Sequence, residues 1–191
     1  MCNEKGTLNH ILAGCKTALS QGRYTWRHNK VLQEISNRIR EKAKTSKAVP
    51  QKAKSVTFVR EGESKPERDQ NNLNRSYLDT ASDWEVRVDL NGKLKIPSSI
   101  TITDLRPDMV LISESTRQLG IIELTVPNEN RIEVSGELKK AKYAPIAEEG
   151  TKKGWRVRMW AVEVGCRGFP ARSLTVLLRD MGYTGKENPF E

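Results

Sequence analysis

The sequence predicts an α/β (α+β) fold in which a mixed β-sheet is flanked by helices. Short apolar, β-branched runs bounded by turn residues recur from residue 82 onward, which is typical of strands with a buried face. From residue 77 the expected order is strand, strand, strand, helix, strand, helix. Such an order places helices against a sheet around one hydrophobic core.

The central feature of this plan is a hairpin of two apolar runs, 109–113 and 119–126. Residues 82–90 alternate apolar and charged and predict a strand with one wet face, followed by the turn signal Asn91-Gly92. A further strand is expected over 155–164. Helices are expected over 23–44, 128–149 and 171–181. Pro145 should end or kink the second of these near Ala144.

We expect three segments along the chain. Residues 1–45 hold a short Cys/His segment and a basic amphipathic helix, in which Trp26 is expected to serve as a packing anchor. Residues 46–76 are polar and rich in turn formers, which indicates a largely flexible linker with one short strand at 55–60. Residues 77–191 form the α/β domain.

Charge favours a polyanionic partner. The chain carries 33 Lys and Arg against 24 Asp and Glu, a net charge of +9. Nucleic acid, DNA or RNA, is the simplest such partner, although a basic protein without such a partner stays open. No apolar run is long enough to cross a membrane, no secretory signal is present at the start, and three cysteines argue against a disulfide framework. An intracellular location, nuclear or cytoplasmic, is expected.

Asp108 and Glu123 are the candidate catalytic acids. Asp108 opens the first apolar run and Glu123 lies inside the second, where an unpaired carboxylate is costly. A hairpin would bring them to one end of the sheet, where they could share Mg²⁺, and lysines 139, 140 and 142 could stabilise negative charge nearby. The alternative is that Asp108 caps a turn and Glu123 pairs with a local basic residue.

Cys2, His10 and Cys15 have the spacing C-x7-H-x4-C. Structural zinc sites take four tetrahedral N and S ligands, so a fourth ligand would have to come from upstream. Two unrelated thiols and a surface histidine are the alternative reading.

Several segments together resemble the C-terminal part of reverse-transcriptase proteins of non-LTR retrotransposons, which carry a zinc knuckle and a restriction-like endonuclease domain of the PD-(D/E)xK type. They are GTLNHILAGCKTAL, GRYTWRHNKVL, ASDWEVRVDL, LRPDMVLISEST, IIELTVPNENR, AKY and VEVGCRGF. They cover nearly the whole chain in the order of that family. This sequence departs from the pattern of the family at Asn128, Asn130 and Pro145.

The resemblance implies roles for individual residues. Cys2, His10 and Cys15 would be the last three ligands of a C-C-H-C knuckle that lacks its first cysteine, a truncated structural zinc site. Asp108 and Glu123 would bind the catalytic Mg²⁺, with Asp89 as an accessory acid. Thr125 occupies the position of the usual lysine. The basic residue would come instead from the following helix, as the pair Lys140 and Tyr143.

The function expected from this resemblance is a metal-dependent endonuclease that nicks target DNA for target-primed reverse transcription, in a fragment of a degenerate element. The alternative is a catalytically inactive nucleic-acid-binding remnant. A third reading, an unrelated basic α/β domain with a protein partner, predicts no binding to nucleic acid.

Overall fold

The computed structural model describes residues 2–46 and 75–183. The N-terminal part contains a π-helical turn η1 (His10–Gly14), a short helix α1 (Lys16–Ser20) and the long helix α2 (Arg23–Thr45). The second part runs through η3 (Leu78–Thr80), β1 (Glu85–Val88), β2 (Met109–Ser113), β3 (Gln118–Thr125), η4 (Glu129–Arg131), α3 (Ile132–Lys152), β4 (Arg156–Glu163) and α4 (Arg172–Asp180). The strand expected at 55–60 and most of the expected linker lie outside the described residues.

The sheet is mixed, as expected, and has the strand order β1-β2-β3-β4. β1, β2 and β3 are antiparallel neighbours, whereas β4 runs parallel to β3. The parallel pair follows from the crossover through α3, which returns the chain to the start of β3 before β4 begins. Glu123 pairs in register with Ala161, and Thr125 pairs with Glu163.

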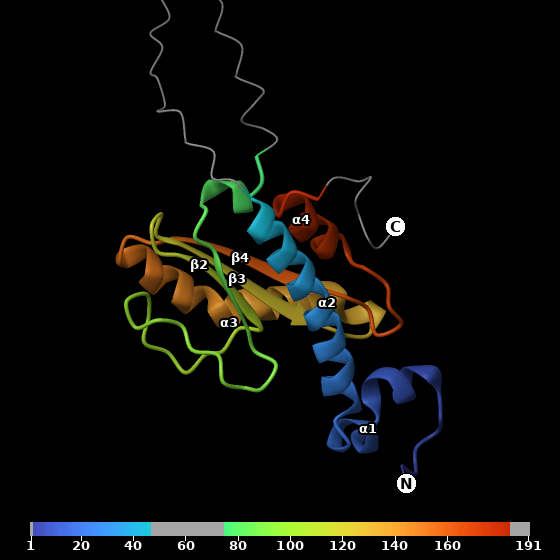
Figure 1. Ribbon diagram of the computed structural model, residues 1–191. Helices are drawn as coiled ribbons and strands as arrows, with labels where there is room; N and C mark the ends of the chain where they lie inside the picture. The colour runs from blue at the N-terminus through green and yellow to red at the C-terminus, as the bar shows by residue number, and fades with distance from the viewer. Residues whose placement is uncertain (1, 47–74, 184–191) are drawn as a thin grey trace, which may run out of the picture.

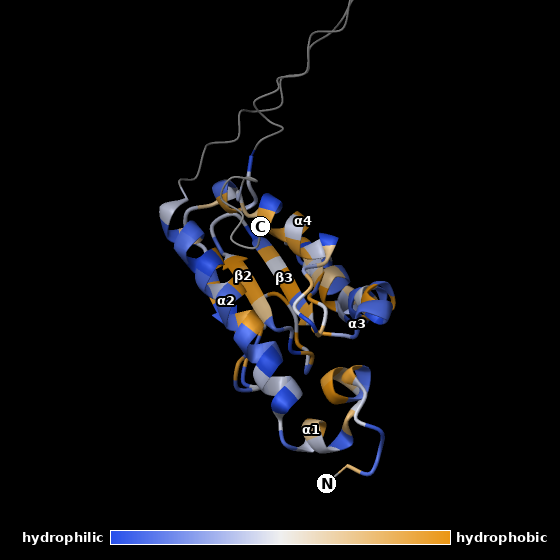
Figure 2. Ribbon diagram, turned by 90° about the vertical axis from the view of Figure 1, so that its right-hand side faces the viewer, coloured by the Kyte–Doolittle hydropathy of each residue, from blue (hydrophilic) through white to orange (hydrophobic). Residues whose placement is uncertain are grey.

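Helices cover both faces of the sheet (Figure 1). One core contains Leu32 and Ile35 of α2, Leu177 of α4, and the side chains of Leu111 and Leu124 from the sheet. The other core joins α3 to the opposite face, with Tyr143 and Ile146 fully buried against strand residues. Hydropathy colouring shows the apolar strands between these more polar helices (Figure 2).

Helix α2 shares its core with the sheet, although the sequence placed it in a separate N-terminal segment. Leu32, Ile35 and Ile39 recur at helical spacing and are at most 1% exposed. Trp26 was expected to pack but is 65% exposed, so that prediction is wrong. The apolar stripe that meets the sheet begins only at Val31, beyond the first turns of the helix.

Pro145 does not end helix α3, which continues to Lys152. Proline removes one backbone hydrogen bond from a helix interior and crowds the preceding turn. Here Tyr143 and Ile146 on either side of Pro145 are buried against the sheet. Burying two large side chains contributes more than the proline costs, so tertiary packing holds the helix together.

Candidate functional site

Asp108 and Glu123 meet at the end of the hairpin because β3 runs past β2. The ladder ends at Met109 opposite Ile122, which leaves the next backbone N–H groups without strand partners. Each acid's side chain accepts a hydrogen bond from one of these N–H groups on the neighbouring strand segment. The Asp108 N–H donates to Glu123 Oε2 at 3.1 Å, and the Leu124 N–H donates to Asp108 Oδ2 at 2.8 Å.

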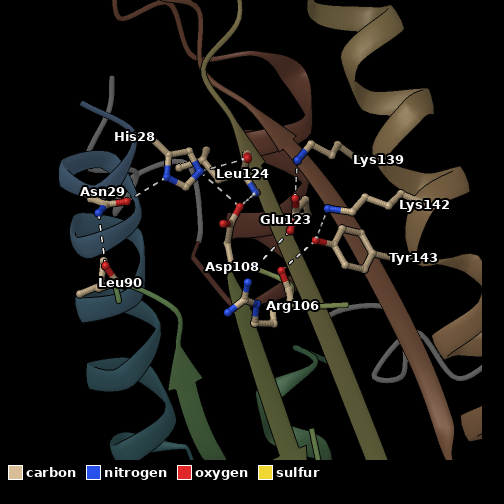
Figure 3. Close-up of polar contacts among 10 residues, drawn as sticks. All are labelled: His28, Asn29, Leu90, Arg106, Asp108, Glu123, Leu124, Lys139, Lys142 and Tyr143. Carbon is tan, nitrogen blue, oxygen red and sulfur yellow. Dashed lines mark hydrogen bonds and ion pairs between the residues drawn. The ribbon is translucent and has the colours of Figure 1, made fainter. Parts of the chain in front are cut away.

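Asp108 faces helix α2, where His28 is its partner (Figure 3). The distance from His28 Nε2 to Asp108 Oδ2 is 3.3 Å, and the same nitrogen lies 3.2 Å from the Leu124 carbonyl oxygen. Burial lowers the pKa of His28, but the Asp108 carboxylate outweighs it and raises this pKa to about 8. His28 is therefore a cation at neutral pH, and Asp108 carries a counter-charge.

The Glu123 carboxylate lies between helix α3 and Asp108, from whose backbone N–H it accepts a hydrogen bond. The Glu123 side chain is 3% exposed, and Oε1 accepts from Lys139 Nζ at 2.5 Å. The Tyr143 hydroxyl donates to the Arg106 carbonyl oxygen at 2.9 Å and accepts from Lys142 Nζ at 3.0 Å. Burial, followed by the negative charge of Glu123, raises the pKa of Tyr143 far above its usual value, so the phenol stays protonated.

The structure brings together some of the predicted catalytic residues and leaves Lys140 outside the group. Lys139 and Tyr143 are four residues apart and share the face of α3 that meets Glu123. Lys140 is turned to the next face, where it is 58% exposed and pairs with Glu137 at 2.8 Å. The lysine beside the candidate acids is thus Lys139, which sequence reasoning named only as one of three.

Asp89 joins the group only through its backbone, because its N–H donates to the Asp108 carbonyl oxygen at 2.8 Å, and Thr125 borders the group. Asp89 Oδ1 accepts from the backbone N–H groups of Lys93 and Leu94 and so caps the turn after β1. Its negative charge still contributes to the raised pKa of Tyr143. The Thr125 hydroxyl is buried and has no hydrogen-bond partner among the described residues.

Cys2, His10 and Cys15 form a second candidate site at the N-terminal end. One ligand atom from each side chain lies within 4.8 Å of the others, so the group could hold a metal ion. Cys15 directly precedes helix α1, and the backbone N–H of Ala18 is the main factor that lowers the pKa of this thiol to about 7. A thiolate at neutral pH is the form that binds zinc.

Glu4 supports this second site from outside. Cys2 Sγ lies 3.2 Å from His10 Nε2, while Glu4 Oε2 lies 3.1 Å from Nδ1 on the far side of the ring. A metal-binding histidine usually donates its other ring N–H to a carboxylate, which fixes the orientation of the ring. The third cysteine of the chain, Cys166, is buried beside Glu129 instead and takes no part.

Sequence reasoning missed His28, and it did not single out Lys139 or include Glu4. Lys139 had a usable signal, because it lies one helical turn before Tyr143. No local sequence signal pointed to His28, because its pairing with Asp108 joins two segments 80 residues apart in the chain.

Comparison with protein-family models, curated proteins and solved structures finds no match for this chain. No helix among residues 2–46 and 75–183 has the length and apolar character needed to cross a lipid bilayer.

Proposed function

We propose that this protein is a Mg²⁺-dependent DNA endonuclease with a PD-(D/E)xK-type core, of the kind that non-LTR retrotransposons use to nick target DNA. One observation carries the proposal. Asp108 and Glu123 are hydrogen-bonded to adjoining backbone groups at one end of a hairpin, with Lys139 on the second carboxylate. Two acids and an amine at a sheet end are suited to phosphodiester hydrolysis.

The donor atoms at this site fit a hard cation. Asp108 Oδ1 accepts no hydrogen bond from the described residues, and Glu123 Oε1 already holds a cation, the ammonium group of Lys139. Mg²⁺ prefers such carboxylate oxygens, so Asp108 and Glu123 are the residues that would hold it. When bound, Mg²⁺ would polarise the phosphate and acidify water beside it.

The chain itself supplies positive charge and positioning. In hydrolysis, water attacks the phosphorus atom, one P–O bond breaks, and a proton passes to the departing oxygen. The Lys139 side chain is 28% exposed, and its positive charge would stabilise negative charge that develops on phosphate oxygens. Tyr143 holds Lys142 and the Arg106 backbone in place through its two hydrogen bonds.

We also assign zinc to the group of Cys2, His10 and Cys15. Two sulfurs and one imidazole nitrogen are the donors that zinc prefers. With three protein ligands the fourth position would be taken by water or by a residue outside the group. Zinc binding would stiffen the N-terminal segment, because Ala18 is the one buried residue among residues 2–22.

The test is nicking of supercoiled plasmid in the presence of Mg²⁺. We expect activity from the unchanged chain and a loss of at least about 100-fold in Asp108→Asn and Glu123→Gln. Asp104→Asn and Glu133→Gln are matched controls, because both side chains are exposed and lie outside the site. Equal nicking by all five proteins would assign the activity to a contaminant and remove the proposal.

A catalytically inactive nucleic-acid-binding protein is the second candidate. The observation that favours it is that each acid already has a basic partner, His28 for Asp108 and Lys139 for Glu123. In that case the acids are structural, as one reading of the sequence holds. DNA binding without nicking at any Mg²⁺ concentration would select this candidate.

A further inference from the structure

A cationic cavity lies between the N-terminal segment, helix α2 and the connection from β3 to α3. Its volume is about 390 Å³, and its walls include Tyr24, Arg27 and His28 on one side and Asn128 and Arg131 on the other. This volume falls within the range of ordinary ligand pockets. Through His28 it adjoins the candidate catalytic acids, because the Nε2 atom of that ring lies against Asp108.

No acidic side chain lines the cavity, whereas three basic ones do. The nearest acid along the chain, Glu129, is engaged elsewhere: its carboxylate accepts from the Arg167 backbone N–H at 2.9 Å and from its guanidinium at 3.2 Å. A concave site with basic walls concentrates anions more strongly than the same charges on an open surface do.

Several donors that line the cavity have no protein partner. The Arg131 guanidinium and the hydroxyls of Thr25 and Ser135 form no hydrogen bond or ion pair with the described residues. Unengaged donors beside a pocket are available to an external acceptor. Phosphate offers several acceptor oxygens and a negative charge, and arginine and hydroxyl groups are its usual partners on a DNA backbone.

Contacts between distant segments fix the shape of this cavity. The Arg27 guanidinium donates to the Leu12 carbonyl oxygen at 2.7 Å, and the Asn128 side chain donates to Asn9 Oδ1 at 2.6 Å. Both contacts hold the η1 region against the rest of the molecule. Ala13, which forms the N-terminal wall of the cavity, lies between His10 and Cys15 of the Cys/His group.

We propose that this cavity binds a backbone phosphate of duplex DNA beside the candidate catalytic acids, with Arg131 as its main contact. The inference deepens the proposed function and rests on its choice of DNA as substrate. It also gives the N-terminal segment a role, which is to complete a phosphate site beside the catalytic acids. Because a phosphate carries no base identity, this contact adds affinity and register but no sequence preference.

The experiment is a salt series of DNA binding with a labelled duplex and no added Mg²⁺, so that cleavage does not enter. Arg131→Ala removes the proposed contact, and Arg131→Lys restores a charge. Arg156→Ala is the matched control, because Arg156 is exposed at the start of β4, the opposite end of the sheet from η4. Thermal unfolding of each variant checks that the fold is retained.

We expect Arg131→Ala to weaken binding about 3- to 10-fold and to reduce the slope of log K against log salt by about 0.9, the amount for one phosphate contact. Arg131→Lys should recover the slope, and Arg156→Ala should keep it. Equal effects of Arg131→Ala and Arg156→Ala would overturn the phosphate site.

The salt series, taken together with the plasmid-nicking assay, separates this proposal from the endonuclease proposal. A selective effect of Arg131→Ala in a protein that does not nick plasmid supports the cavity and removes the endonuclease. Nicking with no selective effect removes the cavity alone. Absence of DNA binding at low salt removes both.

Discussion

Substitution of Lys139 and of its neighbour Lys140 offers a direct test of the buried ion pair at Glu123. Both side chains carry the same charge on the same helix, but only Lys139 reaches a carboxylate that is 3% exposed. Lys140 pairs with Glu137 on the surface. We compare Lys139→Met with Lys140→Met, since methionine keeps most of the apolar stem of lysine and removes the charge.

Removal of one partner from a fully buried ion pair costs about 3–5 kcal/mol. Two features of this pair reduce that cost: Lys139 is 28% exposed, and Glu123 keeps the hydrogen bond from the Asp108 N–H. We therefore expect Lys139→Met to lower the free energy of unfolding by about 2–3 kcal/mol. Lys140→Met should lower it by less than about 1 kcal/mol, as for other exposed pairs.

Urea denaturation at neutral pH measures the free energy of unfolding of both single variants. For a chain of this size, the loss of stability expected for Lys139→Met corresponds to a thermal midpoint lower by about 4–12 °C. The double variant Lys139→Met/Glu123→Gln supplies the control, because a neutral side chain at 123 needs no counter-charge and should regain part of the lost stability. Equal stability of the two single variants would refute the placement of Lys139 on Glu123.

Three further predictions follow from the remaining contacts. With a pKa raised from 6.5 to about 8, His28 contributes stability that is complete below about pH 6.5 and is lost as pH rises through about 8. An NMR titration of the metal-free protein should show this pKa, and the substitution Asp108→Asn should lower it. The variant His28→Gln identifies the NMR signal of His28. Co²⁺ added as a zinc probe should give the visible bands of thiolate coordination, and Cys15→Ser should weaken them, whereas Cys166→Ser should leave them unchanged because Cys166 lies outside the group. Gly150→Ala should destabilise the protein by about 1–2 kcal/mol in urea denaturation despite alanine's helix preference, since the added Cβ would lie 2.9 Å from Val157 Cγ2; a gain in stability would contradict the close packing of α3 on β4.

The strands and helices of this protein follow from local sequence patterns. The hairpin expected over 109–113 and 119–126 is present as β2 and β3, and the helix expected over 23–44 is present as α2. Hydrophobic periodicity and turn residues are local properties, so a single sequence reveals them. β1 is shorter than the alternating run 82–90 because only Glu85–Val88 finds partners on β2.

The sequence by itself determined the elements of the mixed α/β fold, the excess of positive charge, the acids Asp108 and Glu123, and the spacing of Cys2, His10 and Cys15. Only the tertiary structure decided which basic residue each acid meets. Lys139 rather than Lys140 reaches Glu123 because the rotation of α3 on the sheet selects one face of that helix. His28 reaches Asp108 because α2 crosses the opposite face, and such a contact depends on packing between segments that no local pattern records.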